Sequence, residues 1–176
     1  MVVTREDVDS PIGLVSILSC DGAVIALDFG DYEERMLRLL ARSWGNCEIQ
    51  PHPAPSDHAR KIRDYFAGDL IAVNSIRTEL RGTAFQQAAW TALREIQPGS
   101  TWSYLELAKR LGNEKAVRAV GAANGQNPIA IIHPCHRVVA SNHALTGYAG
   151  GLHRKQWLLD HERSNSRWTP SGPLFA

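Results

Sequence analysis

The feature that most constrains the fold of this 176-residue chain is a change of pattern near Arg81-Gly82. Before this point, two short apolar runs, G-L-V-S-I-L-S-C and A-V-I-A-L-D-F, flank Asp21-Gly22, a dipeptide typical of tight β-hairpins. After it, hydrophobic residues recur at helical spacing between capping residues and glycines. The change predicts an α+β fold, in which a small α/β sheet domain, residues 1–81, precedes a mainly helical domain, residues 82–168.

Two helices are predicted to follow the hairpin in the first domain. Asp31, with Glu34 three residues later, is expected to be the N-cap of a helix that ends at Gly45. A Pro-rich loop then leads to a short helix from about Asp57 to Ala67. The stretch N-S-I-R-T-E-L-R before the boundary alternates, and predicts either a final strand or a linker.

The second domain begins with two capping boxes. Thr83 with Gln86 opens one helix, which Pro98-Gly99 ends, and Ser103 with Glu106 opens the next. These signals predict a series of short helices connected by tight turns.

Two of these short helices match a helix-turn-helix. Gly112 ends one helix and Asn113 is expected to cap the next, E-K-A-V-R-A-V-G-A-A-N, in which Arg118 is the long cation among small residues. The second helix fits a recognition helix lying against DNA. An ordinary helical pair, with its small residues packed inside the protein, fits the same pattern.

Charge is distributed unevenly between the two domains. Residues 1–81 contain 9 Lys/Arg and 13 Asp/Glu, a net charge of −4, whereas residues 82–176 contain 10 Lys/Arg and 5 Asp/Glu, a net charge of +5. The basic second half favours an anionic partner such as nucleic acid, although an excess of this size also arises by chance.

Composition and cysteine content exclude several classes of protein. No apolar run reaches the length of about 18 residues that a membrane span requires. The acidic N-terminus lacks a signal-peptide core, which predicts a cytoplasmic protein. The three cysteines, Cys20, Cys47 and Cys135, are widely spaced and form no CxxC pair, which argues against a disulfide framework and a cysteine-rich zinc site.

The run I-I-H-P-C-H-R-V-V, residues 131–139, places polar residues in what reads as a buried strand. Its cationic neighbours, His136 and Arg137, are expected to lower the pKa of the Cys135 thiol and favour the thiolate. Such a thiolate could bind a metal with nearby histidines, form a thioester in a hydrolase, or attack a saturated carbon and retain it. A structural buried cysteine is the alternative without chemistry.

The motif P-C-H-R-V-V resembles the signature of the O6-alkylguanine-DNA alkyltransferases, also called methylated-DNA–protein-cysteine methyltransferases. Further blocks occur in family order: G-T-A-F-Q-Q-A-A-W-T-A-L, G-S-T-W-S-Y-L-E-L-A, R-A-V-G-A-A-N-G-Q-N-P-I-A-I and L-T-G-Y-A-G-G-L-H-R-K-Q-W-L-L-D-H-E. The resemblance covers about residues 82–163 strongly and the first third more weakly. It implies a ribonuclease-H-like first domain and a winged-helix-like second domain.

The resemblance also implies a function. Family members repair DNA by direct reversal, with irreversible, stoichiometric transfer of the alkyl group from O6-alkylguanine, and from O4-alkylthymine, to a cysteine after base flipping. It implies double-stranded DNA as partner, no cofactor, and a monomer in solution, with cooperative binding along DNA left open. A non-catalytic alkylguanine sensor, which in this family lacks the cysteine, and a helix-turn-helix transcriptional regulator are the alternatives.

The resemblance assigns roles at the reacting centre. Cys135 would accept the alkyl group, and His136 would activate it through a water molecule. Glu162 would hold the other imidazole nitrogen, and Asn127 would brace the turn around the cysteine. Tyr104 would face the base and supply a proton to the departing guanine.

The resemblance also assigns a DNA-contacting helix and a base pocket. Arg118 would enter the duplex where the damaged base has left, with Ala119 and Gly121 beside it on the same helix. The loop L-T-G-Y-A-G-G would line the pocket for the base through Leu145, Gly147, Tyr148, Ala149 and Gly150.

Two departures from the family pattern deserve separate expectations. His133 stands where family members usually carry a branched aliphatic residue, so it is either a core histidine with a hydrogen-bond partner or a group that perturbs Cys135. Some members hold zinc in the first domain, but Cys20 and Cys47 lack histidine partners at ligand spacing, so we predict no metal site. Residues 169–176 are predicted to form a flexible tail.

Overall fold

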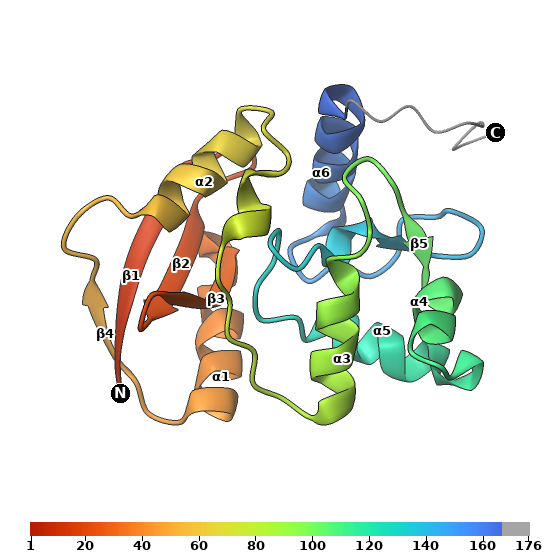
Figure 1. Cartoon of the computed structure of the whole chain (residues 1–176), viewed down its shortest axis with the longest axis horizontal. Helices are drawn as coiled ribbons and strands as arrows, with labels where there is room; N and C mark the ends of the chain where they lie inside the picture. The colour runs from red at the N-terminus through yellow and green to blue at the C-terminus, as the bar shows by residue number, and fades with distance from the viewer. Residues whose placement is uncertain (167–176) are drawn as a thin grey trace.

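The structure is a computed structural model that describes residues 1–166 of the chain. A half built on a sheet lies beside a mainly helical half (Figure 1). The predicted tail, residues 169–176, and the last two residues of the predicted second domain lie outside the described residues. The strands are β1 (Val2–Val8), β2 (Val15–Cys20), β3 (Ala23–Phe29), β4 (Glu48–Pro51), β5 (Trp102–Ser103) and β6 (Val138–Val139). The α-helices are α1 (Glu33–Trp44), α2 (Asp57–Phe66), α3 (Ala84–Leu93), α4 (Tyr104–Arg110), α5 (Val117–Gly125) and α6 (Leu152–Asn165).

The first half contains a four-stranded sheet with the order β3-β2-β1-β4. The predicted β2–β3 hairpin is confirmed, and both turn residues have positive φ, 49° at Asp21 and 74° at Gly22, as a tight turn between twisted strands requires. Two strands were missed. Charged residues in the middle of β1 hide its apolar alternation, and β4 is a short, fully exposed edge strand that pairs in parallel with β1.

Helices cover both faces of this sheet. On one face, Met36 and Leu40 of α1 pack against buried residues of β1, β2 and β3. On the other face, Ile62 and Tyr65 of α2 pack against the opposite sides of β2 and β3. The predicted helix near residues 57–67 is therefore confirmed, and a hydrogen bond from the Ala59 amide to the Ser56 side chain begins it.

The predicted N-cap at Asp31 is wrong. Residues Gly30–Tyr32 form a 3-10 turn, and α1 starts at Glu33 after Tyr32, whose side chain makes no capping hydrogen bond. The Asp31 carboxylate instead pairs with Arg154 of α6, 2.9 Å away. The predicted end of the helix at Gly45 is confirmed, since this glycine has a φ of 71°.

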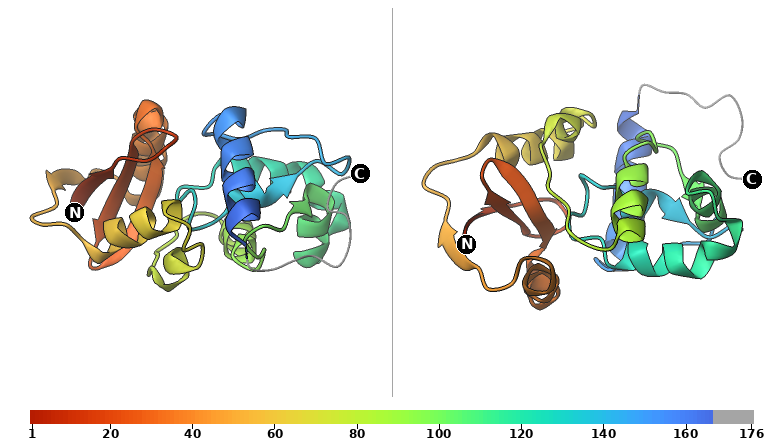
Figure 2. Two further views of the ribbon diagram at one scale, coloured as in Figure 1. Left: turned by 90° about the horizontal axis from the view of Figure 1, so that it is seen from above. Right: turned by 60° about the horizontal axis from the view of Figure 1, so that its bottom comes forward.

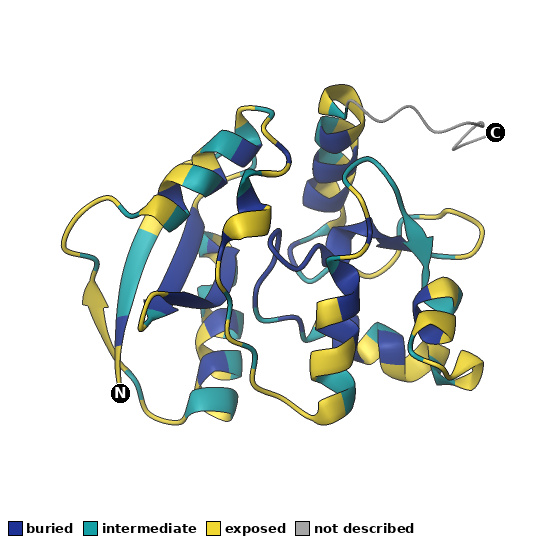
Figure 3. Cartoon of the chain, viewed as in Figure 1, coloured by how far each residue is buried: buried dark blue, intermediate teal, exposed yellow. Residues whose placement is uncertain are grey.

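The outer edge of β3 joins the two halves of the molecule. The Leu27 amide donates to the carbonyl of Pro128, and the Ala130 amide donates back to the Leu27 carbonyl, both at 2.9 Å. Next to them, Thr78 makes an isolated parallel bridge to Val24, so the stretch before the boundary is a linker with one bridge rather than a strand. This junction is among the most buried parts of the chain (Figure 3).

The helical half follows its capping signals closely. Both predicted capping boxes are present, with Thr83 opening α3 and Ser103 opening α4. The helix α3 ends at Leu93, before the predicted end at Pro98-Gly99, and the buried Ile96 lies in the turn between them. Asn113 accepts from the amide of Lys115, but it caps a 3-10 turn that leads into α5 rather than an α-helix.

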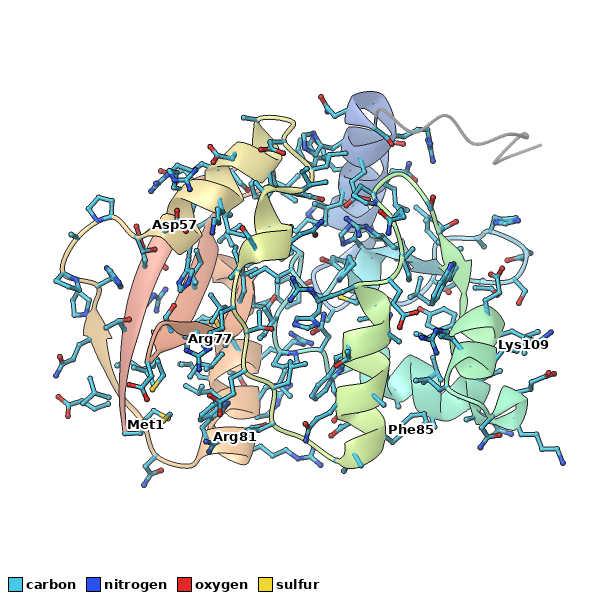
Figure 4. The ribbon with its side chains drawn as sticks, viewed as in Figure 1. Met1, Asp57, Arg77, Arg81, Phe85 and Lys109 are labelled. Atoms are coloured by element: carbon cyan, nitrogen blue, oxygen red, sulfur yellow. The ribbon has the colours of Figure 1, made fainter. Side chains whose placement is uncertain are left out.

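The C-terminal helix α6 lies at the boundary between the halves, as both views in Figure 2 show. Leu158 of α6 belongs to the core of the sheet domain. The guanidinium of Arg81, a residue labelled in Figure 4, lies 3.6 Å from the centre of the Trp44 ring. Within residues 1–166, no helix combines the length and apolar character needed to cross a membrane.

Candidate active site at Cys135

The segment that carries Cys135 consists of turns and not of the buried strand expected from its apolar residues. Ile131 has a φ of 67°, and the Ile132 amide donates to the Ala130 carbonyl at 2.7 Å, which describes a γ-turn strained by a β-branched residue. Pro134, at φ −78° and ψ 70°, centres an inverse γ-turn, the common unstrained form, in which the Cys135 amide donates to the His133 carbonyl at 2.8 Å. Residues Cys135–Arg137 form a 3-10 turn before the two-residue strand β6.

Two buried asparagines hold these turns. The Asn127 side chain donates to the carbonyl of His133 at 2.7 Å and accepts from the amide of Ile129 at 3.1 Å. The Asn124 side chain donates to the carbonyl of Cys135 at 3.3 Å. The structure thus places Asn127 where the resemblance puts it, next to the turn that presents the thiol.

The Cys135 thiol is almost completely buried, with 5% of the residue exposed. Burial raises the pKa of the thiol, and the hydrogen bond of Asn127 and the charges of Arg35 and Lys155 only partly oppose this effect. The expectation that the neighbouring His136 and Arg137 lower the thiol pKa is wrong. Their side chains point to Glu162, so adjacency in sequence does not bring their charge to the sulfur.

His136 and Glu162 form a fully buried pair. Nε2 of His136 lies 2.7 Å from Oε1 of Glu162, and neither side chain has any exposed surface. A carboxylate only accepts, so Nε2 carries the proton and the Nδ1 lone pair is free in the neutral ring. Burial lowers the pKa of His136, which the carboxylate partly offsets.

Arg137 completes the buried ionic cluster. Its Nη2 donates to Oε1 of Glu162 at 2.8 Å and its Nε donates to Oε2 at 2.9 Å, a two-pronged arrangement that fixes the plane of the carboxylate. Burial would raise the pKa of Glu162, but His136 and Arg137 together hold it well below its ordinary value. Glu162 therefore stays ionised although it is completely buried.

His133 has an unambiguous place in the core. Its Nδ1 lies 2.9 Å from the Trp90 carbonyl and its Nε2 lies 3.0 Å from the Thr78 hydroxyl. A carbonyl only accepts, so Nδ1 donates and Nε2 accepts from Thr78. Burial lowers the pKa of His133 to about 4. The residue is thus a neutral core histidine that ties the linker to α3, which is the first of the two expectations.

The loop predicted to line the base pocket contacts the buried cluster that contains Cys135 through Tyr148. Gly150 is buried, and a Cβ atom there would lie 2.7 Å from both the Phe29 and the Tyr148 rings, so only glycine fits. Tyr104, at the start of α4, donates its hydroxyl towards the carbonyls of Thr146 and Gly147 at 3.3 and 3.4 Å. Leu145 and Ala149 are half-buried in the same loop, and Gly147 is exposed.

Buried Lys155 of α6 holds this loop in place. Its Nζ donates to the carbonyl of Val138 at 2.5 Å and to that of Thr146 at 3.0 Å. Burial lowers the pKa of Lys155 to about 8, and the charge of Cys135 opposes the shift. Lys155 therefore connects the strand after the cysteine to the pocket loop.

Three buried polar atoms lack a hydrogen-bond partner within residues 1–166, and all belong to the surroundings of Cys135. They are Nδ1 of His136, the side-chain oxygen of Asn124 and the hydroxyl of Tyr148. Asn124 bonds the Cys135 carbonyl, and Tyr148 lies close enough for the charge of Cys135 to add to the effect of burial in raising its pKa. Buried polar groups are nearly always paired, so this convergence marks a functional site.

The helix-turn-helix surface, in contrast to the buried surroundings of Cys135, carries exposed side chains. Arg118 and Ala119 on α5 are exposed, and Gly121 is half-buried against the ring of Tyr104. No ion pair or hydrogen bond engages the Arg118 side chain in the described part of the chain. Lys109 stands at the outer side of α4 (Figure 4). This face offers cations without partners to an anionic ligand.

Arg35 of α1 connects the first domain to the end of α5. Its guanidinium pairs with buried Asp28 and donates to the carbonyls of Gly125 and Asn127 at 2.7 and 3.2 Å. The contact places a residue of the first domain at the junction of α5 and the cysteine turn.

The described residues contain no candidate metal site, and the two cavities described here lie away from Cys135. Among residues 1–166, no three His, Cys, Asp or Glu side chains gather in an arrangement that could hold a metal ion. A cavity of about 630 Å³ lies beside Leu70 and Pro98, and another of about 350 Å³ lies beside Arg42 and Gln126. Cys135 lines neither of these two cavities.

Several site residues escaped the reading of the sequence. Arg137 was read as a neighbour of the thiol, and Lys155 was read as part of a family block without a role. Tyr65 was assigned to no site, since it sits on an ordinary amphipathic helix of the first domain. No local pattern reports that Arg137 and Tyr65 will meet the distant carboxylate of Glu162, or that Lys155 will meet backbone carbonyls. A buried Lys or Arg is itself a signal once burial is known.

Comparison with known proteins places this site in a family. The family model of the 6-O-methylguanine DNA methyltransferase DNA binding domain matches residues 84–164, and that of the ribonuclease-like domain matches residues 5–80. A methylated-DNA–protein-cysteine methyltransferase of Methanosarcina acetivorans is 52% identical over 156 residues, which cover 89% of this chain and 96% of the relative. The Shigella flexneri protein of the same name is 42% identical over 90% of this chain and 94% of its own length.

Solved structures agree with the sequence relatives. The crystal structure of Mycobacterium tuberculosis OGT in complex with DNA has a TM-score of 0.78 and 38% identity, covering 94% of this chain and 95% of that one. The O6-methylguanine methyltransferase of the same organism has a TM-score of 0.76 and 38% identity, covering 97% and 96%. The chain belongs to the 6-O-methylguanine DNA methyltransferase family.

Proposed function

We propose that this protein repairs alkylated DNA by transferring the alkyl group from O6 of guanine to the sulfur of Cys135. The observation that carries the proposal is the convergence of unpartnered buried polar atoms on a buried thiol, beside a base that a carboxylate orients. The matched family and the relatives named methylated-DNA–protein-cysteine methyltransferase support the same reaction. Nucleophile, base and orienting carboxylate then correspond to Cys135, His136 and Glu162.

Proton transfer explains how a thiol with a raised pKa becomes a nucleophile. Nδ1 of His136 is free to accept a proton, and no direct hydrogen bond joins it to the Cys135 sulfur within the described residues. A bridging water would carry the thiol proton to Nδ1, and Glu162 would stabilise the imidazolium that forms. The thiolate thus forms as the substrate reacts and is not present beforehand.

The transfer is a displacement at carbon. A bond forms between the sulfur and the alkyl carbon while the bond from that carbon to guanine O6 breaks, and the departing guanine takes up a proton. Burial raises the pKa of Tyr104, so its hydroxyl keeps its proton. It lies beside the loop predicted to line the base pocket, where it can turn from the carbonyls of Thr146 and Gly147 to donate to the departing base. The product is a thioether that water does not cleave, so each molecule reacts once.

The DNA partner follows from where the thiol lies. A buried sulfur can reach a base only if the nucleotide is flipped out of the duplex. Arg118 on the exposed face of α5 can enter the resulting gap, and the small residues Ala119 and Gly121 let the helix approach closely. We therefore propose duplex DNA that contains O6-alkylguanine as the substrate, with O4-alkylthymine as a second lesion presenting an equivalent alkyl oxygen.

Stoichiometry tests this function. An excess of duplex carrying O6-methylguanine is incubated with the protein, and the remaining lesion is measured over time. We expect repair to stop after one equivalent of lesion per protein. The Cys135→Ser variant should bind the duplex without repairing it, whereas Cys47→Ser, a matched change at a half-buried thiol, should repair normally. Continued turnover, or repair by Cys135→Ser, would refute transfer to Cys135.

A further inference from the structure

One side chain of the first domain enters the buried cluster around Glu162. The hydroxyl of Tyr65, near the end of α2, donates to Oε1 of Glu162 at 2.7 Å. Tyr65 and Glu162 are both 0% exposed, so no solvent competes for this hydrogen bond. The bond crosses from the sheet domain to α6 and reaches the carboxylate that orients His136.

The two oxygens of Glu162 share Arg137 and otherwise have different partners. Oε2 accepts from Nε of Arg137 at 2.9 Å and from the Gly99 amide at 3.2 Å. Oε1 accepts from Nη2 of Arg137, from Nε2 of His136 and from the hydroxyl of Tyr65, at 2.8, 2.7 and 2.7 Å. Tyr65 therefore adds a donor to the same oxygen that holds the imidazole.

Arg137 and Gly99 hold the carboxylate plane without help from Tyr65. Their hydrogen bonds to Oε2, with the second prong of Arg137 on Oε1, leave the carboxylate little freedom to rotate. The effect of the tyrosine hydroxyl is thus on charge rather than on orientation. A donor at Oε1 withdraws negative charge from the oxygen that faces His136, and so weakens its hold on an imidazolium proton.

We propose that Tyr65 is a positioning residue of the alkyl-transfer site that acts through Glu162. Its hydroxyl limits how strongly Glu162 favours protonated His136, and so keeps Nδ1 free to take the proton of Cys135. The inference rests on the proposed role of His136 as base. It gives the first domain a direct part in the reaction, through one hydrogen bond into the cluster.

Removing the Tyr65 hydroxyl takes no charged group away from the pair of His136 and Glu162. His136 is faced by Glu162 and Lys155 of α6 and by Arg137 of its own turn. The Tyr65 hydroxyl is faced by Glu162, Arg137 and the hydroxyl of Tyr148. The ring itself packs edge-on against Phe66 and His161, with centroids 5.4 and 5.5 Å away, and a phenylalanine at position 65 keeps these contacts.

The pH dependence of the transfer rate tests the proposal. Second-order rate constants for methyl transfer from an O6-methylguanine duplex are measured for the wild-type protein and for Tyr65→Phe between about pH 5.5 and about pH 9. Without the hydroxyl, Glu162 stabilises protonated His136 more strongly. The rising limb of the plot of transfer rate against pH should therefore move to higher pH by roughly half a unit. The rate would then fall about threefold on the limb and stay unchanged on the plateau.

A second variant should move the limb the other way. Fluorination makes a phenol a stronger donor, so 3-fluorotyrosine at position 65 should shift the limb to lower pH without deleting any contact. Tyr32→Phe is the matched control, since Tyr32 is a partly buried tyrosine of the first domain that makes no hydrogen bond to Glu162 within residues 1–166. It should leave the limb in place.

The outcomes separate this inference from the function on which it rests. A wild-type protein that transfers no methyl group contradicts the proposed function. If the wild-type protein reacts but Tyr65→Phe loses the same factor at every pH, the tyrosine has only a structural role and the inference is wrong. Opposite shifts for the phenylalanine and fluorotyrosine variants, each reproduced in the NMR titration of the His136 ring, support it.

Discussion

The surroundings of Cys135 and the exposed face of α5 both contain cationic side chains, but these are buried and paired in the first region and exposed in the second. Around the cysteine, Arg137 and Lys155 are buried and every charged donor is bound to a carboxylate or a carbonyl. On α5, Arg118 is exposed and unengaged in the described chain. The buried cations therefore shape the site, whereas the exposed one is available to a partner.

The difference reflects what each region has to do. A base that works in a buried site must be oriented before the substrate arrives, because bulk water cannot screen a misplaced charge there. Exposed cations on a surface that binds DNA neutralise phosphates, and the release of counterions favours binding. An ion pair with a neighbouring carboxylate would reduce this contribution to the affinity. Substitutions in the first region should change stability and chemistry, and substitutions in the second should change only the reaction on DNA.

Glu162→Gln should have the largest effect. The amide leaves Arg137 buried without a counter-charge, which is expected to lower the free energy of unfolding by about 3 kcal/mol. It also removes the partner that stabilises the His136 imidazolium, so the transfer rate should fall by roughly a hundredfold. Thermal unfolding and single-turnover kinetics measure the two losses.

Acid titration sharpens this prediction. The pKa of Glu162 in the folded protein lies well below its ordinary value, so its contribution to stability is complete at neutral pH and is lost only as the pH falls towards the folded-state value. The stability difference between wild type and Glu162→Gln should therefore shrink in strong acid. A difference independent of pH would mean that the ion pair adds no net stability.

His133→Val should have the next largest effect, again on stability. The change leaves the Trp90 carbonyl without its buried donor, which is expected to cost about 2 kcal/mol at neutral pH. Folded His133 has a pKa of about 4, below that of the unfolded chain, so the unfolded state takes up the extra proton and the wild type loses stability as the pH falls from about 6.5 to about 4. The free energy of unfolding of the valine variant should not decrease in this way, because it has no imidazole to protonate at this position.

The difference in unfolding free energy should consequently narrow between pH 7.5 and pH 5 in denaturant titrations. Thr78→Val serves as the comparison, since it removes one hydrogen bond of His133 and leaves the bond to Trp90. A gap that widens in acid would show that His133 is charged in the folded protein.

Arg118→Ala should change the reaction on DNA and little else. Without a side chain to occupy the gap, transfer from duplex DNA is expected to slow by about tenfold. Reaction with the free alkylated base should be unchanged, because no flipping is needed. Lys109→Ala is the control for the loss of an exposed cation on the neighbouring helix. Equal losses on duplex and free base would contradict the assignment of Arg118.

Asn113→Ala should have the smallest effect. Its side chain accepts from the Lys115 amide at the turn that leads into α5, and such caps contribute roughly 1 kcal/mol. We expect a slightly lower melting temperature and a small decrease in duplex affinity, measured by calorimetry and by fluorescence anisotropy. A change in reactivity towards the free base would link this turn to the cysteine instead.

Local signals predicted those parts of the molecule that local interactions stabilise. The hairpin at Asp21-Gly22 and the capping boxes at Thr83 and Ser103 are each decided by a few neighbouring residues, and the structure confirms them. Strand β4 was missed because its exposed residues carry no strand pattern of their own and form a strand only by pairing with β1.

The site shows the same division. The resemblance identified Cys135, His136 and Glu162, and the structure brings the last two into contact. The direction of the thiol pKa was mispredicted because it depends on burial and on where Arg137 points, which no sequence pattern reports. The partners of His133 and the contact of Tyr65 depend on tertiary packing in the same way.

The identity of the alkylated residue tests the central claim most directly. The protein is incubated with duplex DNA containing O6-methylguanine, digested, and analysed by mass spectrometry of its cysteine peptides. We predict a gain of about 14 Da, one methylene, on the peptide containing Cys135 and none on those containing Cys20 or Cys47. An unmodified Cys135 after exposure to the lesion, or methylation of another cysteine, would contradict the account.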